Sequence, residues 1–577
     1  MNSPNSEQNA SGFSEKCITW GLISILALLF AVTVLLASVP PVDRDALTHH
    51  LFVPKLWLKH GGIYEIPEIP FSYYPMNLDL LYMIPLSFGN DIAPKYIHYL
   101  FALLTAGLIY RYLKNTIGTL YGLLGALFFL SIPIIVKLSI TVYVDLGVVF
   151  FTTTSLLLML HWAQTDFQLR YLLLAGLCCG LAAGTKYNGL ISIVVLTLFV
   201  PIIFQRSAKK NQHSNRRALL YGMIFAAVAI ITFSPWLIRN YVWTGNPIYP
   251  LHNSLFQKSQ PPTVTESQST ANEASNVLQQ ITSKGSSAFT SRRILYYETW
   301  WQALLLPVRY FIEGQDDNPQ FFDGKLTPFL LILSIMAFLF KPLSSQEDRE
   351  KKILLSFALL YFFLTFFQEA LRIRYITPIV PPLVILSMYG LRGLTTVLAR
   401  WTGGENLRRT AAIVIVIGLS CLMLGYNCQY IATQFTTIAP LPYVLREISR
   451  DQYIAAFRPE YPAIQYANSV LPTDAKVLCI FLGNRGYYMD FQPIFEQPYS
   501  GGVFSRFLAS EQPQHTILDE MRNRGISHIL FRTDLTSEWL QRLSHHERQR
   551  VIPLFFKADR PLWSGNGHVV LAVNQRL

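Results

Sequence analysis

Four titratable side chains stand together directly after the first long apolar run of the sequence. They are Asp43, Asp45, His49 and His50. On a helix over residues 45–60, Asp45 and His49 form an i, i+4 pair on one face. A carboxylate at the edge of hydrocarbon is a natural general base, because water is largely excluded there. The same pattern is also typical of an ordinary helix start, where Asp45 complements the helix dipole. The residues alone leave both interpretations open.

Further charged residues lie at the edges of other apolar runs. Asp145 opens the run DLGVVFF, and Lys186 interrupts GLAAGTKYNGL. An ionisable residue in such a place is a functional candidate. The simpler alternatives are that Asp145 caps a helix and that the Lys186 side chain extends to water. Arg372 and Arg374 stand beside Tyr375, and guanidinium groups bind phosphate in a bidentate manner. These residues therefore suit an anionic lipid headgroup, with interfacial positive charge as the simpler alternative.

The stretch SPWLIRNYVWTGNPIYP (234–250) combines Arg239 with several aromatic residues. The aromatic side chains are typical either of a membrane-interface belt or of a platform for sugar or lipid. The sequence contains no P-loop, dinucleotide fingerprint, zincin motif or nucleophile elbow. ATP-driven transport and soluble hydrolase chemistry are therefore disfavoured.

The composition indicates a polytopic membrane protein. Of the 577 residues, 51% are hydrophobic and 14% are charged, whereas soluble proteins carry about 25% charged residues. The net charge of +12 comes mainly from short loops between apolar runs, which is typical of membrane topology and not of nucleic-acid binding. The six cysteines form neither a disulfide framework nor a metal-binding spacing.

About eleven apolar segments approach the length needed to cross a membrane. They lie near residues 18–38, 96–113, 119–137, 142–162, 170–185, 187–205, 218–238, 326–341, 353–370, 375–396 and 410–430. The region 170–205 is consistent with a hairpin or a broken helix. Basic loops at 206–217, 341–352 and 392–409 predict their own cytoplasmic location and a cytoplasmic N-terminus.

Two parts follow from this topology: a transmembrane domain over residues 1–430 and an external domain over 431–577. Long external loops are expected at 39–95 and 239–325, the second with a mobile Ser/Thr-rich segment at 259–276. The tail predicts a small α/β domain. Its expected strands are 475–483 and 527–532, and its expected helix is 515–525.

Taken together, these stretches resemble the GT-C superfamily of lipid-carrier-dependent glycosyltransferases. The nearest groups are bacterial relatives of protein O-mannosyltransferases and of lipid A aminoarabinose transferases. The resemblance rests on ordered motifs across about residues 40–385: DALTHHLFVPKLWLKHGGIY, FSYYPMNLDLLY, YVDLG, GLAAGTKYNGL, SPWLIRNYVWTGNPIYP and RIRYITPIVPPL. The tail, with YPAIQYANSVLPTDAKVL and RGYY, is similar to the periplasmic domain of such enzymes.

The resemblance implies inverting transfer of a hexosyl or pentosyl group from a polyprenyl phosphate to a lipid, glycan or protein acceptor. It places this reaction at the external membrane face. It assigns the catalytic base to Asp45, with Asp43 as the alternative. Many relatives have Asp-Glu at this point, whereas Ala46 follows Asp45 here. Asp145 would position the acceptor or a sugar hydroxyl.

Further residues are expected to bind the substrates, with Arg374 first at the lipid phosphate. The candidates are His49, His50, Lys186, Tyr187, Arg239, Arg372, Arg374 and Tyr375. No cofactor is expected, although acidic residues from two loops leave a divalent metal open.

Two other classes of function fit parts of the sequence. One is a transporter or flippase of lipid-linked saccharides, and the other is an assembly protein with a partner-binding external domain. Transporters carry charged, broken helices near mid-membrane. Here the polar residues gather toward one predicted face, which favours the transferase.

Overall fold

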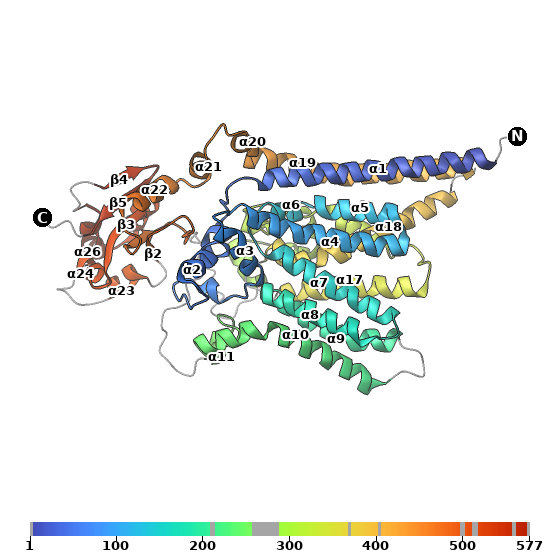
Figure 1. The fold of residues 1–577 in the computed structure, drawn as a ribbon, viewed down its shortest axis with the longest axis horizontal. Coiled ribbons are helices and arrows are strands. Elements are labelled where there is room, and N and C mark those ends of the chain that lie inside the picture. The colour runs from blue at the N-terminus through green and yellow to red at the C-terminus, as the bar shows by residue number, and fades with distance from the viewer. Residues whose placement is uncertain are drawn as a thin grey trace. The chain divides into compact units, whose positions relative to one another are not determined.

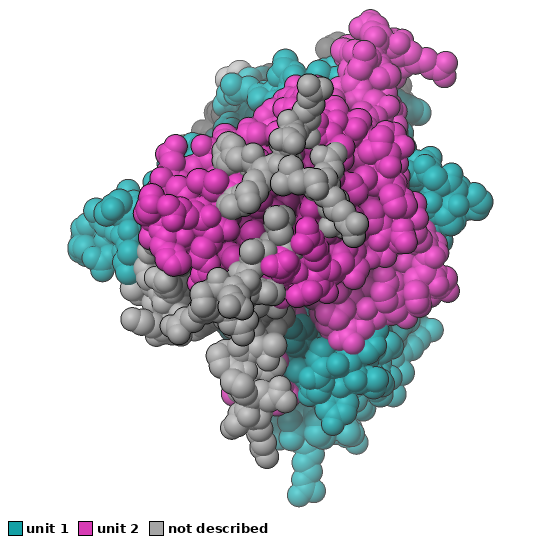
Figure 2. Space-filling model, turned by 90° about the vertical axis from the view of Figure 1, so that its left-hand side faces the viewer, with its two compact units in different colours: residues 1–39, 74–249, 277–440 teal, residues 40–73, 250–276, 441–577 magenta. Residues whose placement is uncertain are grey.

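The structure is a computed structural model. It describes residues 4–207, 214–256, 288–366, 371–401, 405–496, 502–509, 517–556 and 561–573. The segment 259–276 lies outside these ranges. Contacts divide the chain into two units, coloured separately in Figure 2. Unit 1 comprises 1–39, 74–249 and 277–440; unit 2 comprises 40–73, 250–276 and 441–577. The first loop is thus grouped with the tail, a division that does not follow sequence order.

Unit 1 is helical (Figure 1). Its long helices are α1 (Pro4–Ala37), α4 (Ala93–Ile117), α5 (Thr119–Ser131), α7 (Asp145–Gln164), α8 (Leu169–Thr185), α9 (Gly189–Ser207), α10 (Asn215–Thr244), α17 (Ser345–Thr365), α18 (Val380–Trp401) and α19 (Glu405–Ile438). Its shorter elements are α3 (Asn77–Ser87), α6 (Pro133–Ser139), α13 (Ala288–Leu295), α14 (Trp300–Leu304), α15 (Leu306–Ile312), η4 (Pro319–Phe321), α16 (Pro328–Met336) and η5 (Ile373–Ile379). Helix α8 packs against both α7 and α10, and α4 packs against α5 and α7.

The protein is a multi-pass membrane protein. Among the described residues, five helices are long and apolar enough to cross a membrane, and the bent pair α5 and α6 would make a sixth. The exact number of eleven spans stays a prediction. The expected span 119–137 is bent by 67° between Ser131 and Pro133, because proline has no backbone N–H and ends the preceding helix. The expected span 326–341 contains only nine helical residues, in α16.

The uncertain region 170–205 forms two helices, α8 and α9, joined by residues 186–188. Gly189 makes this tight connection possible. A Cβ atom at that position would lie 2.4 Å from the backbone of Ala182, so a larger residue would force the helices apart. At the end of α8, Lys186 adopts an extended conformation, which turns the chain out of the helix. The break therefore sets the position of Lys186.

Unit 2 contains the expected small α/β domain, built on a five-stranded mixed sheet in the order β2-β1-β3-β5-β4. The strands are β1 (Lys476–Ile480), β2 (Gln492–Glu496), β3 (Ile526–Arg532), β4 (Trp563–Gly565) and β5 (His568–Ala572). Its helices are α11 (Asn253–Phe256), α21 (Arg450–Phe457), α22 (Tyr461–Val470), α23 (Val503–Ala509), α24 (Ile517–Asn523), α25 (Thr533–Arg542) and α26 (His545–Phe556). Helix α20 (Pro440–Val444) lies at the boundary between the two units, directly before α21 in the chain. Strands β2 and β3 run parallel to β1, whereas β5 is antiparallel to β3.

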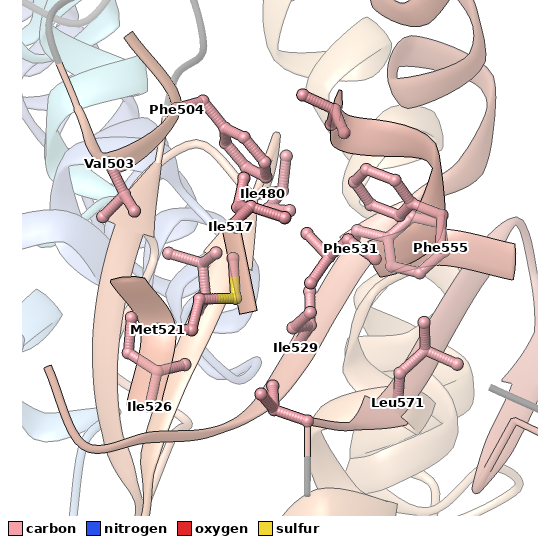
Figure 3. Packing of buried hydrophobic residues seen from close by; sticks show 14 of the residues in the cluster. Ile480, Val503, Phe504, Ile517, Met521, Ile526, Ile529, Phe531, Phe555 and Leu571 are labelled. Carbon is pink, nitrogen blue, oxygen red and sulfur yellow. The ribbon is translucent and has the colours of Figure 1, made fainter. Parts of the chain in front are cut away.

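Alternating residues of the strands build a core on each side of this sheet. Leu478 and Ile480 of β1 join the cluster that contains α23 to α26, whereas Val477 and Cys479 join the cluster around α22. This alternation follows from the two-residue period of a strand. Figure 3 shows the first cluster, with Ile517 and Met521 of α24 among the labelled residues.

The first loop in unit 2 forms η1 (Ala46–His50), α2 (Phe52–His60) and η2 (Pro70–Tyr73). The helix expected over 45–60 therefore has the right extent, but its first turn is a π-helix. The amide of Leu51 donates to the carbonyl of Ala46, 2.9 Å away, five residues back. Gly61 ends α2 in the left-handed conformation, with φ of 84°.

Candidate functional site

A buried ion pair joins two of the predicted site residues in unit 1. Asp145 is the first residue of α7, and Lys186 follows the last residue of α8. The ammonium Nζ of Lys186 lies 2.7 Å from Oδ1 of Asp145, and their side chains are 16% and 4% exposed. Helices α7 and α8 pack side by side, which brings the two side chains together. The ammonium thus has a fixed carboxylate partner.

Aromatic rings and a guanidinium surround this ion pair. The ammonium of Lys186 lies 5.1 Å from the centre of the Tyr375 ring. The guanidinium of Arg374 lies 5.2 Å from the ring centres of both Tyr143 and Tyr375. Arg374 also attracts the Asp145 carboxylate electrostatically. We call these five residues the Asp145 cluster. Its two cations lie near the same aromatic ring, an arrangement that suits an anionic ligand.

His98 holds the turn that carries Tyr143 and Asp145. Its Nδ1 lies 3.1 Å from the carbonyl oxygen of Thr141, and the amide of Leu146 donates to its Nε2 over 3.0 Å. A carbonyl only accepts and an amide only donates, so these partners assign the neutral tautomer with the proton on Nδ1. His98 is completely buried. One ring therefore fixes the backbone on both sides of this turn.

Arg372 points to a different partner from Arg374. Its guanidinium lies 3.3 Å from Oδ2 of Asp323. Asp323 belongs to a tight turn whose neighbour Phe322 accepts a 2.8 Å hydrogen bond from the amide of Ile373. Arg372 therefore ties the start of η5 to this turn, and Arg374 joins the Asp145 cluster.

Tyr187 and Arg239 belong to a second polar group in unit 1. The hydroxyl of Tyr187 donates to the carbonyl of Tyr249 over 2.8 Å and accepts from Nδ2 of Asn240 over 2.9 Å. Arg239 donates to Oδ1 of Asn240 over 2.8 Å, and its guanidinium stacks on Trp236 with 4.5 Å to the ring centre. Since Lys186 and Tyr187 are consecutive, the break between α8 and α9 connects the two groups.

The acidic residues of the first loop lie in unit 2. The carbonyl of Asp43 accepts from the amide of Leu47 over 3.1 Å, and Asp45 precedes the π-turn. Burial raises the pKa of Tyr453, and the negative charge of Asp43 raises it further. Asp43 is thus close enough to Tyr453 of α21 to interact with it electrostatically.

The rings of the two histidines of the π-turn are in contact, tilted by 46° with their centres 4.0 Å apart. His49 stacks on Phe71, with ring centres 4.5 Å apart, and its Nδ1 lies 2.9 Å from Oγ1 of Thr48. Both histidines are buried. Within the described ranges, no three His, Cys, Asp or Glu side chains are grouped so as to hold a metal ion.

The sequence reasoning missed His98, Tyr143 and Asn240. Tyr143 stands two residues before Asp145, in the stretch that was singled out, and its carbonyl accepts a 2.5 Å hydrogen bond from the hydroxyl of Tyr82. His98 is a lone histidine in an apolar run, with no spaced partner in the sequence. Its role depends on a contact with residues more than 40 positions away, so no local signal identifies it.

Comparison with known proteins places this architecture in a fold class. The family described as dolichyl-phosphate-mannose-protein mannosyltransferase matches residues 84–238, which is less than half of the chain. A search of curated proteins found no match. The architecture is the GT-C fold of membrane glycosyltransferases, which confirms the resemblance at the level of the fold.

Particular solved structures share nearly the whole architecture. ArnT from Cupriavidus metallidurans in the apo state is 13% identical, with a TM-score of 0.56, over 96% of this chain and 98% of that chain. The same protein bound to undecaprenyl phosphate is 14% identical, with a TM-score of 0.55 and the same coverage. The Archaeoglobus fulgidus oligosaccharyltransferase in complex with Zn and sulfate is 13% identical, with a TM-score of 0.50, over 92% of this chain and 71% of that chain.

Proposed function

We propose that the protein is an integral membrane glycosyltransferase that moves a sugar from a polyprenyl phosphate to a lipid, glycan or protein acceptor. The observation that carries this proposal is the Asp145 cluster, in which Lys186 and Arg374 gather in buried, aromatic surroundings. Two cations held in low dielectric suit a lipid phosphate. The ArnT structure of the same fold contains undecaprenyl phosphate, which supports this ligand class.

The proposed reaction is a single inverting displacement. An acceptor hydroxyl attacks the anomeric carbon and forms the new C–O bond while the C–O bond to the phosphate breaks. The polyprenyl phosphate leaves with the bonding electron pair, and Lys186 and Arg374 stabilise its growing charge. The carboxylate of Asp45, or of Asp43 as the alternative, takes the hydroxyl proton.

Asp145 has a specific part in this scheme. It holds the ammonium of Lys186 at 2.7 Å before the lipid phosphate arrives. Such pre-organisation reduces the reorganisation needed during the reaction. Arg372 has its own partner in Asp323, so the proposal assigns the phosphate first to Arg374 and Lys186. Tyr187 and Arg239 would line the sugar or acceptor side. The scheme includes no metal, so transfer should persist in a chelator such as EDTA.

The proposed orientation follows the basic loops. A cytoplasmic N-terminus and an external tail would place the reaction at the outer face of the cell membrane, where flipped lipid-linked sugars are available. Cysteine labelling at 206–217 and at 441–577 should give opposite accessibility from outside the cell. Equal accessibility of the two regions would contradict this topology.

The proposal is tested with purified protein and lipid-linked sugars extracted from the producing cells. The release of polyprenyl phosphate and the appearance of a glycosylated product are followed by mass spectrometry. The Asp45→Asn variant should fold normally, bind undecaprenyl phosphate and release it from the sugar donor far more slowly than wild type. A comparison of surface glycans with and without the protein identifies the acceptor. If wild-type protein neither binds undecaprenyl phosphate nor changes any glycan, the proposal is wrong.

A further inference from the structure

The acidic residues of the first loop are held by the tail. We propose that Arg458, Tyr488 and Lys55 form a clasp that positions Asp43 and Asp45 for proton transfer. This inference rests on the proposed function, because it assigns positioning residues to the proposed base. All of its contacts lie within unit 2.

The clasp holds the backbone before the two aspartates. The hydroxyl of Tyr488 donates to the carbonyl of Pro41 over 2.7 Å. The guanidinium of Arg458 donates to the carbonyl of Val42 through both Nε and a terminal nitrogen. Two consecutive carbonyls that precede Asp43 are therefore bound by side chains more than 400 residues away in sequence.

The clasp also holds the backbone after the two aspartates. The amide of Tyr487 donates to the carbonyl of Leu47 over 3.1 Å. Lys55 of α2 donates to the carbonyls of Tyr487 and Met489 over 2.9 and 3.1 Å, and to Oδ1 of Asp490 over 2.9 Å. Because an ammonium has three donors, these acceptors satisfy Lys55 fully. The segment with Asp43 and Asp45 is thus fixed at both ends.

The connection from β1 to β2, residues 481–491, is built to make these contacts. Arg485 forms a 2.7 Å ion pair with the buried carboxylate of Glu460, which holds the connection against the start of α22. At Gly486 the backbone approaches Phe52 so closely that a Cβ atom would lie 2.4 Å from its ring. A strand connection is otherwise free to vary, so this close fit indicates that it serves the first loop.

The clasp would affect the reaction rate by fixing the position of the proposed base. A general base must lie within hydrogen-bond reach of the proton that it takes, and a misplacement of about 1 Å can lower a rate about 100-fold. The π-turn that follows Asp45 has backbone hydrogen bonds one residue longer than those of an α-helix, and such turns are frequent at functional sites. The tail is therefore an intramolecular support for the acidic segment and not an independent module.

The experiment compares Arg458→Leu and Tyr488→Phe with a matched control, Arg550→Leu, in the full chain. Arg550 is also half-buried in unit 2 and donates to two carbonyls, those of Phe507 and Leu508, which lie outside the first loop. Hydrogen exchange is measured at residues 43–51. Both clasp variants should exchange there about 3- to 10-fold faster, the loss expected for one or two hydrogen bonds, whereas Arg550→Leu should not.

Turnover is measured on the same samples. The clasp variants should lower kcat about 10- to 100-fold and leave KM for the lipid-linked donor unchanged, and Arg458→Lys should recover part of kcat. Unchanged exchange in both variants, or equal acceleration in Arg550→Leu, would overturn the clasp. Faster exchange with unchanged kcat would also overturn the proposal, because the clasp would then hold the loop without positioning the base. The base itself is tested separately by the activity of Asp45→Asn.

Discussion

The ion pair between Asp145 and Lys186 allows a quantitative test of the Asp145 cluster. At 2.7 Å and an effective dielectric constant of about 20, two unit charges attract each other by about 6 kcal/mol. Desolvation of both groups offsets much of this attraction. Removal of one partner leaves a buried charge alone, and it typically costs about 3–5 kcal/mol. Asp145→Asn and Lys186→Met should each destabilise the protein by this amount.

The double variant should be less destabilised than the sum of the two single variants, because it leaves neither charge without its partner. We expect a coupling energy of about 1–3 kcal/mol. The measurement is reversible unfolding in mixed micelles, made on all four forms. The pair Asp348 and Lys352 is a matched control, because its charges are also 2.7 Å apart but its side chains are 35% and 58% exposed. Its coupling should be only about 0.3–0.5 kcal/mol.

Binding of undecaprenyl phosphate separates the two roles within the pair. Lys186→Met should weaken binding by about 1.5–3 kcal/mol, the range for a hydrogen bond to a charged group. Asp145→Asn should retain binding, and added lipid should stabilise this variant more than wild type, because the phosphate neutralises the lone ammonium. A coupling energy below about 0.5 kcal/mol, together with unchanged binding in Lys186→Met, would refute the reasoning.

Three further predictions concern single residues. Asp45→Asn should lower kcat about 100- to 10,000-fold, the usual contribution of a general base, and Asp43→Asn should lower it less. A larger loss of kcat in Asp43→Asn than in Asp45→Asn would assign the base to Asp43. His98→Gln should retain kcat, since an amide can both donate and accept as the neutral imidazole does, whereas His98→Leu should lose it; equal activities would show that the ring does not hold the turn. Burial raises the pKa of Glu298, but hydrogen bonds from Arg292 and Arg309 outweigh burial and hold this pKa below its ordinary value of 4.5. The wild-type protein should therefore lose stability as the pH falls below about 4.5. Glu298→Gln should flatten this pH dependence in acid-unfolding curves.

The sequence predicted the elements of this fold better than the paths between them. The apolar runs predicted helices, and the strand pattern of the tail predicted β1 and β3, because these signals are local. The 67° bend before Pro133 was visible in principle, since proline ends a helix, but the run on both sides is apolar enough to span as one piece. The π-turn after Asp45 has no known local signature and could not be predicted.

The contacts of the first loop show a different limit. Arg458 binds the carbonyl of Val42 from 416 positions away, and Tyr488 binds the carbonyl of Pro41 from 447 positions away. Nothing in the composition of either segment indicates a partner, because a backbone carbonyl is the same in every residue. Such contacts are determined by the tertiary fold alone.

The three cations on the predicted external side differ in the residues that they contact. The sequence left Arg372, Arg374 and Lys186 all as candidates for phosphate binding. The structure separates them by their partners. Arg372 forms an ion pair with Asp323 and so helps to hold the turn that contains Asp323. Lys186 and Arg374 instead both lie near the ring of Tyr375, and both attract the carboxylate of Asp145. This shared position favours Lys186 and Arg374 over Arg372 as the residues that bind a phosphate.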